Sequence, residues 1–325
     1  MAQYVLTRIA WVIPVVLVVS ILVFGLIRIA PGDVVELMME GMATGGSVGS
    51  AEKTAARLRA ELGLDKPIYI QYLVYLGGLV QGDFGKSVWT GRPTLGEIGK
   101  ALPVTVELTA MSMMIAVLIS VPLGTLSAVR QDTWIDYVAR VGAIVGLSLP
   151  SFWTGTIIVV FLALSWGYAV PLGYATLTEN PWSNFQKMIF PSFVLGIGLA
   201  GSLARMVRSA LLEVLRQEYI RTAFGKGLTE RVVVVRHAMK NALIPVITIM
   251  GLQLGTLLGG TVIVETIFSV PGIGSLTVSA IQRRDFTQLQ TNVLFFSIFL
   301  LLMNFVVDLL YSWMDPRIKY GTSET

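Results

Sequence analysis

Six stretches of the chain contain no Asp, Glu, Lys or Arg and are long enough to cross a membrane. An α-helix needs about 20 apolar residues to span a hydrocarbon core of ~30 Å. Only 14% of the 325 residues are charged, against about 25% in a typical soluble domain, and the mean hydropathy is +0.73. We therefore expect an all-α integral membrane protein with six transmembrane helices. The stretches are 9–27, 108–129, 141–178, 188–204, 242–264 and 286–307.

Two of the six stretches have unusual lengths. The third, 141–178, is long enough for a span and a re-entrant or interfacial piece, which we place at VPLGYATLT. The fourth, 188–204, has only 17 residues. Its helix is therefore expected to continue into the basic segment that follows, with Arg205 and Arg208 extending toward water.

The distribution of Lys and Arg predicts the orientation of the spans. Basic residues in short loops favour the cytoplasmic side. With both termini inside, thirteen Lys and Arg lie on the inner side. Three lie in short outer loops: Lys187, Arg283 and Arg284. The other eight fall in or beside a long outer loop, and the rule applies mainly to short loops. We therefore expect a multi-pass protein of the plasma (inner) membrane with cytoplasmic termini. The first stretch lacks a small-residue cleavage site, so we expect an uncleaved span.

These assignments divide the chain into four parts. They are 1–30, with the first span; 31–100, a small extracytoplasmic domain; 101–314, a core of spans 2–6 with the cytoplasmic loop 205–241; and 315–325, a cytoplasmic tail. In the outer domain, SAEKTAARLRAELG predicts a short amphipathic helix with Leu58 and Leu62 on one face and Gly63 as its end. For this domain, a purely structural role, as a cap that holds span 1 against span 2, is as well supported as a functional role.

The residue content excludes several kinds of chemistry. There is no cysteine, which excludes disulfides and thiolates, and a single histidine cannot form a histidine metal cluster. Gly85-Lys86-Ser87 resembles part of a phosphate loop, but Val80 stands where that motif needs a glycine. We therefore expect no ATP hydrolysis, no metal site and no cofactor in this chain.

Ion-coupled carriers bury ionisable groups in the middle of the membrane, and the six uncharged stretches have none. Glu107, Glu265 and Asp308 stand at the edges of these stretches, where solvation is cheap. We expect them to make interfacial or inter-helix polar contacts. The lack of ionisable groups inside the six stretches argues against secondary transport, proton pumping and intramembrane catalysis.

Small and polar residues occur in the second, third and fifth stretches. Pro122, Pro150 and Pro245 predict kinks, and Gly255 and Gly259 match a small-xxx-small pattern that lets helices approach closely. Plain packing explains most of these residues. The candidates for lining a water-filled path are Ser148, Ser151, Thr154, Gln253 and Thr256.

The segment 205–245, between the fourth and fifth stretches, indicates a cytoplasmic partner. Its residues 205–240 hold eight Lys and Arg against three Glu. Apolar spacing predicts a helix from Leu211 to Phe224, followed by a break at Gly225-Lys226-Gly227. Gly227 suits a positive φ.

A second helix is expected after Thr229, its predicted N-cap. A solvated basic loop explains the charge of this segment. It does not explain a glycine turn with Tyr219, Phe224 and Leu228 around it. We therefore predict a helix–turn–helix knob that fits a socket on a partner.

Motifs along nearly the whole chain resemble those of one family. RTAFGKG, continued by RHAMKNALIP, resembles the cytoplasmic loop of ABC importer permeases. The form EYIRTA…KGL…RHA..NALIPV resembles that of the dipeptide/oligopeptide/nickel permeases, and of the first permease of the pair. The other matching motifs are IAPGD, ELGLDKPIYIQY, GDFGKS, SLPSFW, VRSALLEVLRQEYIRTA, TIFSVPGIG, QRRDF and VVDLLY…DPRI.

The resemblance assigns roles residue by residue. Arg221-Thr222-Ala223 stand where the general loop has Glu-Ala-Ala, and Gly227 stands at the loop glycine. Lys240 replaces the general motif's proline, a departure that the peptide family shares. Phe224 and Gly225 replace the more usual Arg and Ala. The implied ATPase-coupling residues are Tyr219, Arg221, Thr222, Ala223, Phe224, Gly225, Lys226, Gly227, Leu228, Glu230, Arg231 and His237.

The resemblance also implies the fold and the partners. The fold would be that of a type I ABC importer permease, forming half of a path for di- or oligopeptides. The partners would be a second homologous permease, two cytoplasmic ATPase subunits that bind ATP and Mg, an extracytoplasmic binding protein and membrane lipid, with no nucleic acid. This chain would be a transport subunit and not an enzyme.

Other functions remain open at this stage. Similar permeases carry nickel, glutathione or other small solutes, and the scarcity of histidine only mildly disfavours a metal. A self-sufficient secondary carrier would need an intramembrane ionisable group and perhaps inverted repeats. A membrane scaffold would explain the basic loop but not the polar, glycine-rich spans.

Overall fold

The computed structural model describes residues 2–29, 59–60, 65–167, 169, 171 and 173–314, and side chains between residues 12 and 305 of these ranges. The regular structure in them is helical, apart from one isolated bridge between Lys86 and Pro93. The amphipathic helix expected in SAEKTAARLRAELG lies outside the described residues except for Arg59 and Ala60, and the tail 315–325 lies wholly outside them.

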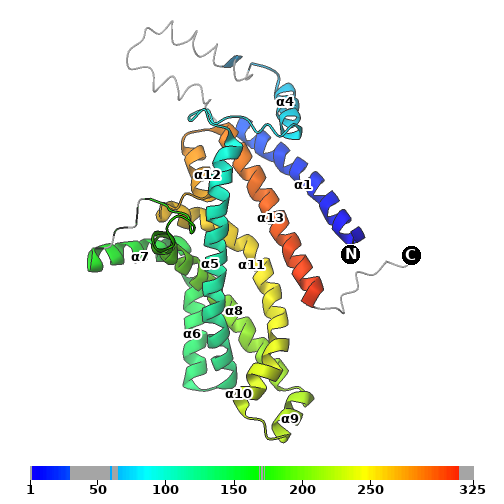
Figure 1. Ribbon diagram of the computed structural model, residues 1–325, viewed down its shortest axis with the longest axis vertical. Helices are drawn as coiled ribbons and strands as arrows, with labels where there is room; N and C mark the ends of the chain where they lie inside the picture. Colours follow the sequence, from blue (N-terminus) through cyan, green and yellow to red (C-terminus); the bar gives the residue numbers. More distant parts are fainter. Residues whose placement is uncertain are drawn as a thin grey trace. The chain divides into compact units, whose positions relative to one another are not determined.

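Five described helices are long and apolar enough to cross a membrane (Figure 1). A sixth span is reached if α6 (Trp134–Ser148) and α7 (Ser151–Trp166) are counted as one, with a bend of 98° between them. The five are α1 (Ala2–Ile29), α5 (Thr94–Val129), α8 (Pro181–Leu215), α11 (Met239–Ile267, within the apolar helical run Glu230–Ile267) and α13 (Phe286–Met314).

The third uncharged stretch contains a break that we did not predict. It falls at Leu149–Pro150, between α6 and α7. The separate piece expected at VPLGYATLT comes after the end of α7 at Trp166 and is only partly described. A proline removes a helical N–H and disfavours helical geometry at the residue before it. Leu149 is accordingly extended, with ψ of 119°. Figure 1 shows α7 leaving α6 at a steep angle.

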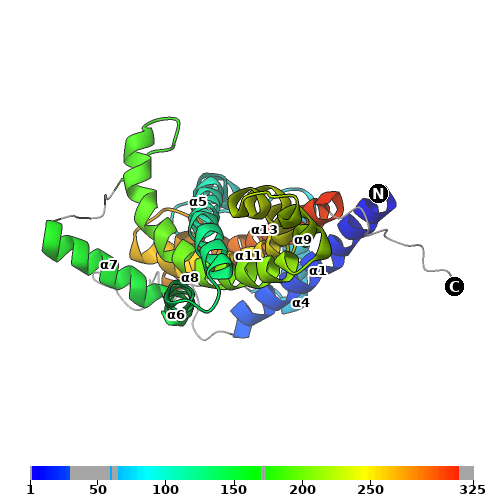
Figure 2. The ribbon, with the colours of Figure 1, turned by 90° about the horizontal axis from the view of Figure 1, so that it is seen from below.

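The described residues form two compact units. Unit 1 lies within 1–102 and 276–299, and unit 2 within 103–275 and 300–325. Figure 2 looks along the helices of unit 2 from the end that carries α9 (Glu218–Gly225).

In unit 1, two of the sequence motifs contact each other. The Ser87 hydroxyl of GDFGKS donates to Asp285 of QRRDF at 2.5 Å, and the Trp89 indole N–H donates to the Arg283 carbonyl at 2.7 Å. A short apolar helix, α4 (Ile68–Val80), packs on α1 through Tyr72 and Phe24, whose ring centroids lie 5.3 Å apart. Ser87 therefore makes a structural contact within unit 1.

In unit 2, α8 lies at the centre, and sixteen of its 35 residues are buried. The helix continues to Leu215, as the short fourth stretch predicted. Its start is earlier than expected, at Pro181, with the Asn180 side chain capping the Ser183 N–H at 3.0 Å. Lys187 therefore lies inside this helix, buried, and donates to the Pro171 carbonyl; its placement in an outer loop was wrong.

A fully buried carboxylate, that of Glu265, connects three segments of unit 2 by hydrogen bonds. Glu265 accepts hydrogen bonds from the Thr105 hydroxyl at 2.8 Å and from the Ser275 N–H at 2.9 Å. Gly272 and Gly274 of the motif TIFSVPGIG lie directly against it, and a Cβ at Gly274 would come within 2.8 Å of the carboxylate. The predicted inter-helix contact exists, but the expectation that Glu265 is cheaply solvated was wrong.

Close helix contacts around α8 generate a stability prediction. A Cβ at Gly124 of α5 would lie 2.6 Å from the Ala204 carbonyl oxygen, and one at Gly201 would strike the Ala143 carbonyl oxygen. Gly124→Ala and Gly201→Ala should each destabilise the protein by about 1–3 kcal/mol, because the helices must move apart. The measurement is the thermal unfolding midpoint in detergent.

The matched control is Gly142→Ala in α6, where a Cβ meets nothing within 4 Å. It should be neutral or slightly stabilising, because alanine favours a helix over glycine. Equal midpoints for all three variants would contradict this account of the packing.

Candidate functional site

The basic segment begins with a sharp break after α8. We predicted one helix from Leu211 to Phe224, but α8 ends at Leu215 and Gln217 is extended, with ψ of 148°. The new helix, α9, therefore runs in a different direction (Figures 1 and 2). The apolar periodicity of the sequence continues across the break because both helices bury a face against the same cluster.

That cluster fixes α9 to the rest of unit 2. Ile220 and Ala223 are the buried residues of α9. They pack in one apolar cluster with Leu211 of α8 and with Val233 and Ala238 of the π-helix η1 (Val233–Ala238). The Asn241 amide also donates to the Tyr219 hydroxyl at 2.8 Å.

The opposite face of α9 and the following turn are exposed. Tyr219, Phe224 and Leu228 expose 43%, 45% and 36% of their surface, respectively. Exposed apolar groups gathered in a charged loop favour contact with another protein. The other exposed residues of the implied coupling set are Arg221, Thr222, Gly225, Lys226, Gly227, Glu230 and Arg231, whereas Ala223 is buried and His237 half-buried.

Gly227 forms the turn as predicted. Its φ is +78°, and its N–H donates to the Phe224 carbonyl at 2.9 Å. Thr229 stands at the N-cap position of α10 (Glu230–Val232), but its side chain makes no capping hydrogen bond. The knob therefore consists of a helix, a turn and a second helical part. The helix before the turn is α9, residues 218–225. The part after the turn continues through η1 into α11 (Met239–Ile267).

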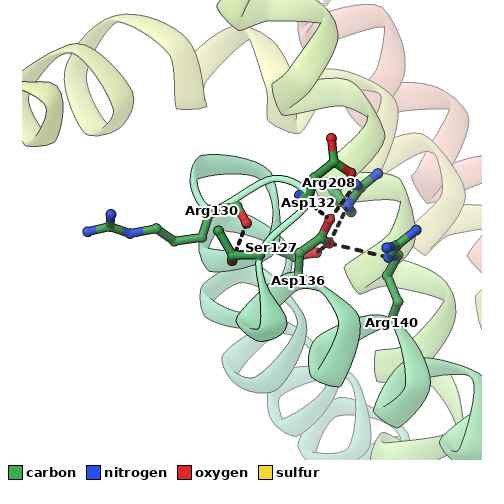
Figure 3. Close-up of polar contacts among 7 residues, drawn as sticks. Ser127, Arg130, Asp132, Asp136, Arg140 and Arg208 are labelled. Carbon is green, nitrogen blue, oxygen red and sulfur yellow. Dashed lines mark hydrogen bonds and ion pairs between the residues drawn. The ribbon is translucent and has the colours of Figure 1, made fainter.

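A buried ion pair next to this region was missed by the sequence analysis (Figure 3). Asp136, at the start of α6, is fully buried. Both of its oxygens accept hydrogen bonds from the Arg208 guanidinium of α8, at 2.8 Å each. The Ser127 hydroxyl of α5 donates to it at 2.5 Å and the Asp132 N–H at 3.0 Å, while Arg140 lies 3.5 Å away.

This cluster joins α5, α6 and α8 seven residues before α8 ends. Arg208 was expected to extend toward water, and that expectation was wrong, because a buried carboxylate holds it. No pattern in the sequence pairs positions 136 and 208. The only signal was that Asp136 stands near the start of an apolar stretch, where an acid needs a partner.

A cavity of about 360 Å³ lies between α6, α7, α8 and α11 in unit 2. Its lining is apolar except for four residues, Ser151, Thr154, Gln253 and Thr256, and none of the lining residues is charged. These are four of the five predicted path residues. The fifth, Ser148, does not line this cavity, and its hydroxyl donates to the Ile144 carbonyl at 2.9 Å. The Gln253 amide donates to the Ser202 hydroxyl at 2.8 Å.

The long apolar helices are those of an integral membrane protein, and comparison with known families gives its class, a permease. The chain belongs to the family described as binding-protein-dependent transport system inner membrane component, whose sequence profile matches residues 120–320. The profile of the N-terminal part of such membrane components matches residues 1–109.

Several relatives match over almost their full length. The dipeptide transport system permease protein DppB of Alkalihalophilus pseudofirmus is 38% identical over 346 residues, covering 98% of this chain and 100% of the relative. DppB of Escherichia coli K12 is 37% identical, covering 98% and 99%. The glutathione transport system permease protein GsiC of Salmonella choleraesuis is 38% identical, covering 98% and 100%.

Solved structures share the fold. A chain of the MetNI methionine ABC transporter in an inward-facing conformation has a TM-score of 0.57 at 18% identity, covering 68% of this chain and 97% of its own. A chain of an amino acid ABC transporter has a TM-score of 0.53 at 15% identity, covering 67% and 94%. The fold is that of an ABC importer permease.

The ion pair generates a second prediction. Asp136→Ala should destabilise the protein by about 3–5 kcal/mol, because it leaves Arg208 uncompensated in a largely buried site. The double variant Asp136→Ala/Arg208→Ala should lose less unfolding free energy than the two single variants lose together. Unfolding midpoints of the four proteins of this double-mutant cycle measure the coupling.

Arg130→Ala is the control for the loss of a charged side chain near Asp136. Arg130 is exposed, and its guanidinium points away from Asp136 (Figure 3). Its removal should leave the midpoint unchanged. Additive effects of Asp136 and Arg208 would contradict a direct interaction between them.

Proposed function

We propose that this chain is the first of two permease subunits in an importer for di- and oligopeptides. The observation that carries the proposal is 37–38% identity over 98% of the chain to dipeptide and glutathione permeases. Both named substrates have peptide bonds. The second permease, an extracytoplasmic binding protein and two ATPase subunits complete the proposed assembly, with cytoplasmic termini of this chain and with ATP and Mg bound by the ATPases.

The cavity supports a peptide as cargo. A lining of hydroxyls and one amide offers hydrogen bonds to a peptide backbone without selecting a charged side chain. A path for a free metal cation would favour carboxylate or imidazole ligands, which this lining lacks. Glutathione is the second candidate, favoured by the relative that is named for its transport.

The knob is the proposed point of coupling to an ATPase. Its inner face is locked into the apolar cluster by Ile220 and Ala223, so it moves with α8 and η1. Its outer face presents Phe224 and Leu228 beside the glycine turn. An ATPase that contacts this face differently in two states would shift the permease between two conformations, because coupling needs contacts that differ between states.

A transport measurement tests the substrate. The complete complex, reconstituted in proteoliposomes with its binding protein and ATP, should accumulate a labelled dipeptide. Glutathione and Ni²⁺ serve as the competing cargoes under the same conditions. ATP-dependent uptake of either without uptake of any di- or oligopeptide would overturn the peptide assignment.

A glycine variant tests the coupling. Gly227→Val should abolish substrate-stimulated ATP hydrolysis while the complex remains assembled, because a β-branched residue strains a backbone at φ of +78° and distorts the turn. The rate of ATP hydrolysis with and without loaded binding protein is the measurement.

Gly91→Val is the matched control. Gly91 also has a positive φ, of +66°, with nothing within 4 Å of an added Cβ, and it lies in the predicted outer domain. It should suffer similar strain and keep normal stimulation. Normal stimulation in the Gly227 variant would refute the role of the knob.

A further inference from the structure

Unit 1 contains a charged cavity that peptide transport leaves without a role. Its volume is about 300 Å³, and it lies where α1 ends, between α1, α4, the turn after α4 and the start of α13. Three charged residues line it: Arg28, Lys66 and Asp83. Phe24 and Val74 are among its apolar lining residues.

The helix beside this cavity has the character of a membrane-surface helix. α4 contains no charged residue, and none of its residues is buried. Its exposed residues are large and apolar, with Val80 83% exposed. Large apolar side chains exposed on a helix next to an apolar span favour contact with lipid. The other exposed apolar residues are Ile68, Tyr69, Leu73 and Val74.

α4 is fixed to the last part of α1. The Tyr72 hydroxyl and the Ser20 hydroxyl are hydrogen-bonded at 3.0 Å, and the Phe24 ring packs against both Tyr72 and Tyr75. Ser20 lies nine residues before the end of α1. The exposed apolar side chains of α4 are therefore held beside a helix that is long and apolar enough to span a membrane.

Local contacts orient the polar groups of the cavity. The Arg28 guanidinium stands 5.0 Å from the centroid of the Phe24 ring, and the Gln71 amide donates to the Lys66 carbonyl at 2.7 Å. Asp83 accepts a hydrogen bond from the Gly85 N–H at 2.9 Å. The cavity thus has two cationic side chains and one carboxylate.

Tyr75 adds a hydrogen-bond donor. Its hydroxyl is buried and has no hydrogen-bond partner among the described residues. Burial, with a smaller effect of Tyr72, raises the pKa of Tyr75 to about 12, so this hydroxyl stays protonated at neutral pH. A buried donor without a partner costs about 1–3 kcal/mol, and a ligand oxygen would remove that cost.

We propose that this cavity binds the headgroup of phosphatidylethanolamine, with the phosphate against Arg28 and Lys66 and the ammonium against Asp83. Arg and Lys bind phosphate through charge-assisted hydrogen bonds, and a carboxylate complements an ammonium. The acyl chains lie over the apolar face of α4. A phosphatidylglycerol headgroup has a neutral glycerol in place of the ammonium and leaves Asp83 without a cationic partner, and a free peptide leaves the apolar side chains of α4 uncovered.

Lipid titration of the purified, delipidated complex tests this proposal. Diheptanoyl phosphatidylethanolamine should raise the unfolding midpoint in a saturable way, because a ligand of the native state stabilises it. Diheptanoyl phosphatidylglycerol should bind more weakly. Lys66→Gln should weaken phosphatidylethanolamine binding about fivefold, the effect of roughly one interfacial charge. Asp83→Asn should remove the preference over phosphatidylglycerol.

Lys86→Gln is the matched control, because Lys86 is an exposed lysine of the same unit that does not line the cavity. It should bind both lipids like the unchanged protein. Equal lipid binding by the Lys66 and Lys86 variants, or no preference of the unchanged protein for phosphatidylethanolamine, would overturn the proposal. So would stabilisation by dialanine that depends on Lys66. Each of these results leaves the peptide-import function untouched, because that function rests on uptake and coupling.

Discussion

Two buried carboxylates restrain α5, and the arrangement of unit 2 depends on them. The Thr105 hydroxyl donates to Glu265 near one end of α5, and the Ser127 hydroxyl donates to Asp136 near the other. These positions are 22 residues apart, or roughly 33 Å along a helix, close to the ~30 Å thickness of a hydrocarbon core. Apolar contacts inside a membrane have little directional preference. The hydrogen-bonded carboxylates supply it, because leaving either one unpaired is costly.

The carboxylate at Asp136 also links the packed core to the exposed knob. It holds Arg208 of α8, and α8 leads within a few residues to α9. Close contacts at Gly124 and Gly201 leave α8 little room to slide against α5 and α6. A force applied to α9 would therefore act on a helix that is fixed to its neighbours. In the proposed assembly, these contacts would connect an ATPase bound at α9 rigidly to the apolar helices of unit 2.

The sequence predicted the helical membrane fold because long uncharged stretches have few alternatives. It also predicted the turn at Gly227, since a positive φ there favours glycine. It did not predict the break after Leu215, because apolar residues on both sides bury against one cluster and preserve the periodicity. The ion pair between Asp136 and Arg208 was missed for a different reason: it joins residues 72 positions apart, and only the fold brings them together. The burial of Lys187 and Glu265 was missed likewise, since their partners lie in other segments, such as Thr105 for Glu265, and only the fold brings them together.

The proposed coupling requires that the exposed face of α9 contacts an ATPase. The chain has no cysteine, so a single introduced cysteine can report this contact without further changes. Phe224→Cys, in the complex with its ATPase subunits, should cross-link to an ATPase through a short thiol-reactive linker, with a yield that changes when ATP is added. Leu164→Cys, 83% exposed on the apolar helix α7, should not cross-link. Equal yields from the two positions, or none from position 224, would contradict the account.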